Sequence, residues 1–252
     1  MPRASRYFMP GYVWHVTHRC HKKEFLLKFA KDRQRWRRWL FEARKRYGLC
    51  VLNYIVTSNH VHLLVRDRGG GEIAQSMQLV AGRTAQEYNL RKTRTGAYWE
   101  DRYHATVVDT EEYLARCMTY IDLNMVRAGV VKHPAEWDIC GYREIQTPPM
   151  RYAIIDQTVL MDMFGFETAK QLRLACRDWA EEALQTTDPQ RDSAWTESLA
   201  VGRSMFVQGV KDRLGLKVRH RQVIEQGGAH VLREPECSYM HHLGDEEPVL
   251  SK

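Results

Sequence analysis

The spacing of apolar residues divides the first half of the chain into strand-like and helix-like segments. Four segments alternate apolar and polar residues or are continuously apolar, as β-strands are, and three others repeat apolar residues at helical spacing. In chain order, we predict strands at 11–17, 49–56, 60–65 and 105–108, and helices at 24–47, 72–91 and 112–127. The order strand, helix, strand, strand, helix, strand, helix predicts an α+β fold in which helices flank a single sheet.

The pattern changes in the second half, where two prolines at 148–149 mark a linker. Helical spacing returns at 158–184 and at 195–214. The last residues, about thirty, are polar and contain glycine, so we assign no element to them. We therefore predict a first domain over residues 1–145 and a helical C-terminal extension with a polar tail over residues 146–252.

Positive charge concentrates in the first domain. Residues 1–145 hold 25 Lys and Arg against 15 Asp and Glu, whereas residues 146–252 hold 13 against 16. The segment 31–46 alone carries eight basic and two acidic residues, interleaved with aromatic ones. One interpretation is a solvated helix face over buried aromatic residues, and an equally good one is a helix that faces nucleic acid.

Several classes of protein do not fit this composition. The chain has no run of 18 or more apolar residues, so we expect no membrane span. Its start lacks the apolar core of a secretory signal. The six cysteines are scattered and form no CxxC pair, which argues against a zinc ribbon or a disulfide scaffold and for reduced thiols. We expect a cytoplasmic protein, associated with the nucleoid if its partner is DNA.

His60 and His62 are the most informative pair in the sequence, because they lie together in a predicted strand. Side chains alternate along a strand, so both imidazoles point to the same face, with Cα atoms about 7 Å apart. Two imidazoles so placed can converge on one divalent ion. The spacing alone is common in proteins, and it favours metal binding only if other ligands lie nearby.

A third ligand and a nucleophile are candidates on the helix predicted at 112–127. One stripe of this helix holds Tyr113, Cys117, Tyr120 and Asn124. Tyr120 and Asn124 are therefore neighbours, one turn apart. A metal held by two imidazoles and an amide oxygen keeps open positions for phosphate oxygens, while the tyrosine oxygen attacks the phosphorus. The product would be a phosphotyrosine and a free 3′-hydroxyl.

Other interpretations of these residues stay open. Tyrosine on an amphipathic helix is more often a half-buried core residue with a wet hydroxyl, and Asn124 could simply lie near the helix end. Tyr113 is a rival nucleophile, but its neighbour Cys117 does not suit a hard cation. Another spaced histidine set is interpreted as structural or DNA-proximal, because its first two members fall on opposite faces of a strand: His15, His18 and His21.

Four stretches taken together resemble a known family. They are MPGYVWHVTHR at 9–19, SNHVHLL at 58–64, GAYWEDRY at 96–103 and YIDLNMVRAG at 120–129. In this order and spacing they resemble the HUH single-tyrosine transposases, specifically the REP-associated tyrosine transposases related to small insertion-sequence enzymes. Any one stretch would be a weak signal, but four in order over about residues 3–145 make a specific one.

The resemblance implies a ferredoxin-like palm, an antiparallel sheet flanked by helices. It implies that His60, His62 and Asn124 bind a divalent metal, Mg²⁺ or Mn²⁺, and that Tyr120 is the nucleophile. The implied activity is cleavage and strand transfer of single-stranded DNA that carries REP-type hairpins, through a covalent 5′-phosphotyrosine, by a monomer or a homodimer. The DNA contacts expected in these stretches and at the N-terminus are Arg3, Arg6, Trp14, Arg19, Arg102 and Arg127.

The sequence also departs from the family pattern. Met125 stands where the family usually has proline after the asparagine, and Thr57-Ser58 replaces the usual Met-Pro before the histidine motif. The extension is longer than a minimal enzyme needs, and we hypothesise that it covers or regulates the active face. Two alternatives remain: a domesticated protein that binds structured repeats without cutting them, and a metal-dependent hydrolase that uses water instead of tyrosine.

Overall fold

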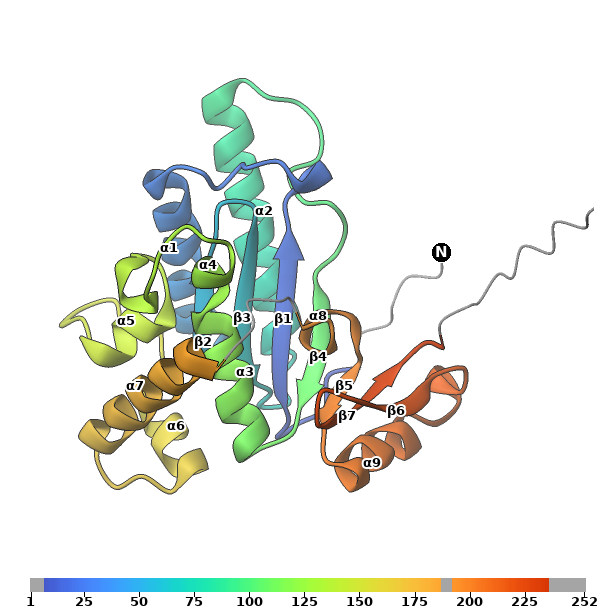
Figure 1. Ribbon diagram of the computed structural model, residues 1–252. Coiled ribbons are helices and arrows are strands. Elements are labelled where there is room, and N and C mark those ends of the chain that lie inside the picture. The colour runs from blue at the N-terminus through green and yellow to red at the C-terminus, as the bar shows by residue number, and fades with distance from the viewer. Residues whose placement is uncertain (1–6, 187–191, 236–252) are drawn as a thin grey trace, which may run out of the picture.

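The computed structural model describes residues 7–186 and 192–235. The expected contacts Arg3 and Arg6 and the end of the polar tail lie outside these residues. Within the described residues, seven strands form a single sheet with helices packed around it (Figure 1). Across the sheet the strands are β2 (Cys50–Val56), β3 (His60–Arg66), β1 (Val13–Arg19), β4 (His104–Val108), β5 (Ala200–Gly202), β7 (Ala229–Arg233) and β6 (Gln222–Gln226).

The first four strands form the predicted palm. β1 pairs antiparallel with both β3 and β4, and β2 pairs antiparallel with β3. The chain order β1, α1 (Ala30–Tyr47), β2, β3, α2 (Glu72–Lys92), β4 is the split βαβ arrangement of ferredoxin-like folds. The predicted α+β fold is therefore confirmed, and α1 ends as expected at Gly48, whose φ of 70° lies in the left-handed region.

The two faces of this sheet differ in chemistry. One face presents apolar side chains such as Val61, Leu63 and Val16, all fully buried. The opposite face carries His60 and His62 on β3, and the strand register places the polar residues of β1 and β4 beside them. Sheets normally bury apolar side chains, so a polar stripe on an inner face indicates a site rather than a core.

The third predicted helix is interrupted in the structure. We expected one helix over 112–127, but α3 (Glu112–Asp122) ends at Leu123 and a short α4 (Asn124–Arg127) follows. Leu123 has φ −80° and ψ 5°, which lies outside the regular helical region. The break occurs even though Met125 replaces the usual proline, so proline is not needed to turn the chain here.

Helices fill much of the extension, as predicted, but in shorter pieces. The expected helix at 158–184 is divided by Gly165, whose φ is 69°. The expected helix at 195–214 is divided by strand β5. The helices of the region 124–252 that the structure describes, beyond α4, are α5 (Gly141–Gln146), α6 (Gln157–Phe164), α7 (Ala169–Thr186), α8 (Ala194–Glu197) and α9 (Ser204–Leu214).

The extension also contributes strands, which no sequence pattern predicted. β5 pairs in parallel with β4, and β7 and β6 follow it antiparallel, so the extension continues the sheet of the first domain (Figure 1). β5 spans only three residues, too few for an alternating pattern to be recognised. Arg203, just after β5, binds the buried Asp109 after β4 through two hydrogen bonds of 2.8 and 3.0 Å and holds the two parts together.

None of the helices in the described ranges is long and apolar enough to cross a membrane.

Candidate active site

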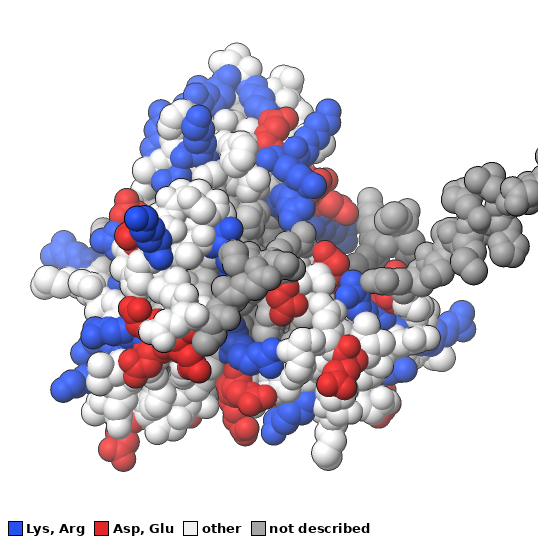
Figure 2. Space-filling view, viewed as in Figure 1, with Lys and Arg blue, Asp and Glu red and all other residues white. Residues whose placement is uncertain are grey.

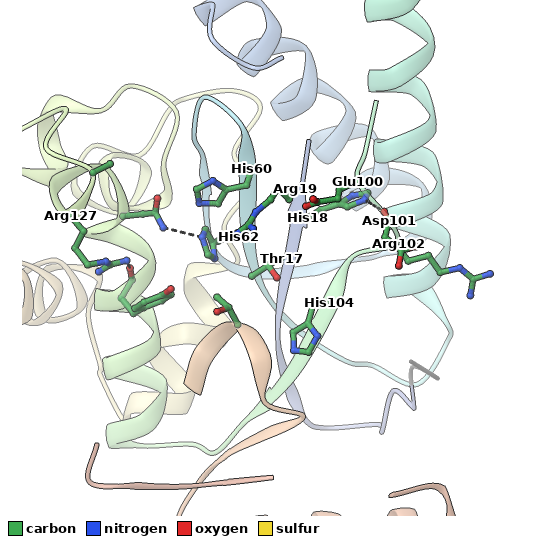
Figure 3. Close-up of a pocket in the computed structure, with 14 residues that line it drawn as sticks. Thr17, His18, Arg19, His60, His62, Glu100, Asp101, Arg102, His104 and Arg127 are labelled. Carbon is green, nitrogen blue, oxygen red and sulfur yellow. Dashed lines mark hydrogen bonds between the residues drawn. The ribbon is translucent and has the colours of Figure 1, made fainter. Parts of the chain in front are cut away.

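A polar pocket of about 500 Å³ opens on the histidine-bearing face of the sheet (Figure 3). Its walls come from β1, β3, β4, the 99–103 loop, α3, α4 and α8, so the first domain and the extension both line it. The lining residues are Thr17, His18, Arg19, His60, His62, Glu100, Asp101, Arg102, His104, Tyr120, Asn124, Arg127, Ala128 and Thr196.

His62 lies at the back of the pocket and is held by two neighbours. Its Nδ1 lies 2.8 Å from Nε2 of His15, and its Nε2 lies 3.0 Å from Nδ2 of Asn124. The side chain is only 2 % exposed, and burial, followed by the nearby His60 and His15 rings, holds the pKa of His62 well below its usual value. The ring is therefore neutral at physiological pH, the state in which histidine binds metals.

His60 is half-buried and fixed by the turn that precedes it. Its Nδ1 lies 2.7 Å from Oδ1 of Asn59 and 3.0 Å from Oγ1 of Thr57. Because the Asn59 oxygen can only accept, Nδ1 of His60 carries a proton, and in a neutral ring the lone pair is on Nε2. Figure 3 shows His60 and His62 pointing from β3 toward the side of the pocket where Arg127 lies. The Thr57-Ser58 departure thus supports His60 through the threonine hydroxyl.

The three expected ligands, His60, His62 and Asn124, lie together in this pocket. Two imidazoles and one amide suit a hard or borderline divalent cation and leave positions open for substrate oxygens. The Asn124 amide now directs Nδ2 at His62, and half a turn about its terminal bond would present Oδ1 instead. Groups of three or more His, Cys, Asp or Glu that could hold a metal are absent from the described residues, so any metal here depends on the asparagine.

Tyr120 lines the same pocket from the last turn of α3 and is 8 % exposed. The guanidinium of Arg127 lies over its ring, 4.2 Å from the ring centre, and donates a hydrogen bond to the Tyr120 carbonyl. Burial lowers the pKa of Arg127 from its usual value, and the nearby tyrosine opposes that shift. The arrangement places a positive charge against the face of the candidate nucleophile.

The rival tyrosine lies elsewhere. Tyr113 is buried at the start of α3 and does not line the pocket. Burial, together with the neighbouring Glu112, raises the pKa of Tyr113, which disfavours a phenolate. Geometry and electrostatics therefore both favour Tyr120 over Tyr113 as a nucleophile.

The expected DNA contacts divide into two groups. Arg19, Arg102 and Arg127 line the pocket, although Arg102 points away from the histidines (Figure 3). Trp14 is 1 % exposed and packs edge-on against Phe8, with ring centres 5.0 Å apart. A buried indole has no free face for a base, so the prediction of a DNA contact at Trp14 is wrong, and Trp14 is a core residue.

Basic side chains continue beyond the pocket. Figure 2 shows Lys and Arg gathered toward the top of the view, over the region where α1 and α2 lie in Figure 1, with Asp and Glu more frequent below. Among the arginines of α1 and α2, Arg38 and Arg83 are exposed and Arg35 is partly exposed. The predicted basic helix is thus one side of a wider basic region, while its Trp36 and Trp39 are buried.

The sequence patterns did not indicate the roles of three residues that the structure brings to Tyr120 and His62: His15, Trp195 and Thr196. His15, interpreted as structural or DNA-proximal, contacts His62 directly, because the register of β1 on β3 places it on the same face. Trp195 and Thr196 come from α8 in the extension; the Trp195 ring lies 6.1 Å from that of Tyr120, and Thr196 lines the pocket. The odd-numbered residues of β1 share one face of the strand, and this alternation was the available signal for His15. Only the pairing of β1 with β3 shows that this face is the one that carries His62.

Comparisons with known proteins find a matching family and similar solved structures. Residues 10–124 match the sequence model of a family described as "Transposase IS200 like". No curated protein matches the chain. One similar solved structure is a REP-associated tyrosine transposase bound to a REP hairpin, with 16 % identity, a TM-score of 0.49, and coverage of 62 % of this chain and 94 % of that one.

A second similar structure, from Deinococcus radiodurans, belongs to a protein proposed to be a transposase, with 18 % identity, a TM-score of 0.34, and coverage of 47 % of this chain and 94 % of that one. The matched residues 10–124 begin just before β1 and end on Asn124, so they span the palm and both histidines. Over these residues the chain is therefore similar to the IS200-like transposases, and this similarity supports a DNA-cleaving transposase activity.

Proposed function

We propose that this transposase cleaves and transfers single-stranded DNA at REP-type hairpins through a covalent 5′-phosphotyrosine formed on Tyr120. The observation that carries the proposal is the convergence of His60, His62, Asn124 and Tyr120 on one pocket with basic walls. A protein that only binds structured repeats has no need for two imidazoles and an amide beside a tyrosine. Arg19 and Arg102 lie in the pocket walls and would hold the DNA phosphates.

In this proposal His60, His62 and Asn124 hold a divalent cation, Mg²⁺ or Mn²⁺. When bound, the cation would polarise the scissile phosphate and neutralise its charge. The chain's own residues supply the rest. The Tyr120 oxygen attacks the phosphorus, the 3′-oxygen of the preceding nucleotide leaves, and the phosphate stays on the tyrosine. Arg127, over the ring, stabilises negative charge as it develops on the Tyr120 oxygen.

The covalent product keeps the energy of the broken phosphodiester bond, which makes rejoining possible. The phosphotyrosine bond replaces the phosphodiester bond, so a free 3′-hydroxyl can attack it and rejoin DNA without another energy source. The buried position of Tyr120 and the α8 wall of the pocket limit the access of water to that bond. This favours strand transfer over hydrolysis.

The first test is a denaturing gel of the full chain with end-labelled single-stranded hairpin DNA and Mn²⁺ or Mg²⁺. We expect a covalent protein–DNA band that requires the metal and disappears in Tyr120→Phe. Tyr113→Phe is the matched control, because it removes a hydroxyl from the same helix outside the pocket, and it should keep the band.

Other outcomes identify the alternatives. Cleavage without an adduct, unaffected by Tyr120→Phe, would indicate a water-dependent hydrolase. Binding without cleavage would indicate a domesticated repeat-binding protein. A second DNA with the same base composition but a scrambled stem tests the hairpin part of the proposal, and equal adduct yields on both DNAs would contradict it.

A further inference from the structure

A backbone carbonyl of the extension is connected to the candidate metal site. Nδ1 of His15 lies 2.9 Å from the carbonyl oxygen of Trp195, which belongs to α8, 180 residues away in the chain. Nε2 of the same ring lies 2.8 Å from Nδ1 of His62. The His15 and His62 rings are nearly parallel, with an angle of 13° between their planes and centres 5.0 Å apart. The three groups form one buried chain of hydrogen bonds.

The chemistry of these groups sets the direction of each hydrogen bond. A carbonyl oxygen can only accept, so His15 carries its proton on Nδ1. A neutral His15 then has its lone pair on Nε2, which must accept from Nδ1 of His62. His62 is thereby left with its lone pair on Nε2, the atom that faces Asn124 in the pocket. His15 is fully buried, and its two ring nitrogens face the Trp195 carbonyl and the His62 ring rather than a carboxylate, so the neutral form is favoured.

We propose that His15 is a positioning residue that fixes the tautomer of His62. Because its Nδ1 donates to the Trp195 carbonyl, its Nε2 accepts from Nδ1 of His62, and Nε2 of His62 is left unprotonated and able to bind the metal. The extension thereby takes part in building the metal site. The opposite tautomer of His62 would carry a proton on Nε2 and could not bind a metal there. It would also set two lone pairs against each other between the buried rings, which leaves a buried polar group unsatisfied.

The same helix is docked by other side chains of the sheet, which makes the carbonyl a fixed group. Thr106 of β4 donates to the Ser198 carbonyl at 2.6 Å and lies 3.3 Å from the Trp195 oxygen. Nε2 of His104 lies 3.0 Å from the Ser198 carbonyl. α8 therefore stays in place without His15, and the effect of His15 on His62 can be separated from the docking of α8.

This inference rests on the proposed function in one respect, since it takes His62 as a metal ligand. Two substitutions of His15 separate the effect of its hydrogen bonds from the effect of its packing. His15→Phe keeps a ring but removes both hydrogen bonds. His15→Gln restores both chemically, because its amide nitrogen can donate to the Trp195 carbonyl while its oxygen accepts from His62. Thr106→Val is the matched control, because it removes the other side-chain contact with the same carbonyl.

The first readout is the ¹⁵N chemical shifts of the His62 ring in the metal-free full-length protein, which report the tautomer. We expect Nδ1–H in the wild type, in His15→Gln and in Thr106→Val, and loss of that preference in His15→Phe. The second readout is the affinity for Mn²⁺ alone, measured by titration calorimetry. We expect a loss of about 10–100-fold in His15→Phe, the range found for partners that orient a ligand, with most of it recovered in His15→Gln.

Unchanged His62 shifts in His15→Phe, or equal losses of Mn²⁺ affinity in Thr106→Val and His15→Phe, would overturn the inference. Failure of His15→Gln to recover either readout would also do so, because it would show that packing alone matters. The two proposals fail separately. A wild type that binds no Mn²⁺ contradicts the proposed metal site, while the His62 tautomer still reports on His15.

Discussion

At the scale of single residues, Arg127 has two possible tasks that the structure separates. Sequence resemblance suggested a DNA contact, but its guanidinium lies against the Tyr120 ring and is bonded to the Tyr120 carbonyl. A phosphate contact would act on DNA affinity and its salt dependence. A cation against the nucleophile would act on the rate of attack. The geometry favours the second task.

We therefore predict that Arg127→Gln slows formation of the covalent adduct about 2–30-fold, the range expected for losing about 0.5–2 kcal/mol of cation–π and charge stabilisation. The affinity of the Tyr120→Phe protein for the same DNA should change less when Arg127→Gln is added. Arg116→Gln is the control, because Arg116 lies over Tyr113 on the same helix, 5.4 Å from the ring centre. A loss seen only in affinity, with a shallower salt dependence, would assign Arg127 to DNA binding.

At the scale of elements, the break after α3 brings a carboxyl into the core. Asp122, the last residue of α3, accepts a hydrogen bond of 2.9 Å from Asn53 of β2. Burial raises the pKa of Asp122 from 3.8 to about 7, and the Asn53 hydrogen bond opposes part of that shift. The Asp122–Asn53 hydrogen bond connects the helix that carries Tyr120 to the sheet. It also buries a carboxyl group, whose ionised form is unfavourable there.

The resulting pH dependence has a definite sign. Between pH 3.8 and about 7 the folded state keeps the Asp122 proton and the unfolded state does not, so the free energy of unfolding falls as the pH rises through this window. Asp122→Asn removes the charge and keeps an oxygen for Asn53. We predict that it raises the melting temperature at pH 8 relative to the wild type, by an amount worth a few kcal/mol in order of magnitude, and changes it little at pH 4. Equal effects at both pH values, measured by circular dichroism, would contradict this.

At the scale of the whole molecule, the extension is built into the sheet. β5 covers the edge of β4, and Gly202 of β5 lies so close to Asp109 that a Cβ there would be 2.4 Å from the Asp109 Cβ. Removing the extension would expose the β4 edge and leave the buried Asp109 without Arg203. The hypothesis that the extension covers the active face gains support from α8, which walls the pocket.

We predict that a chain ended after residue 149 melts at least on the order of 10 °C lower than the full chain, or does not fold cooperatively. A chain ended after residue 235 keeps every described element and should melt like the full chain. Thermal unfolding followed by circular dichroism distinguishes the two. A cooperative, equally stable 1–149 fragment with unchanged cleavage would show that the extension is dispensable for both fold and activity.

Much of the palm and the candidate site could be predicted from the sequence, because its signals are local. Alternation placed His60 and His62 on one face of a strand, and helical spacing placed Tyr120 near Asn124. The structure keeps both relations, although the helix breaks between the last two residues. The excess of basic over acidic residues in the first domain could also be predicted, by counting charges along the sequence.

The remainder depended on contacts between segments far apart in the chain, which no local periodicity encodes. Strand register decided that His15 meets His62, and that Trp14, on the other face, is buried. The parallel pairing of β5 with β4 brought Trp195 to the site across 180 residues. The sequence by itself thus determined which chemical groups the site contains, and the tertiary structure decided their partners and protonation, because hydrogen-bond partners and burial exist only once the sheet is assembled.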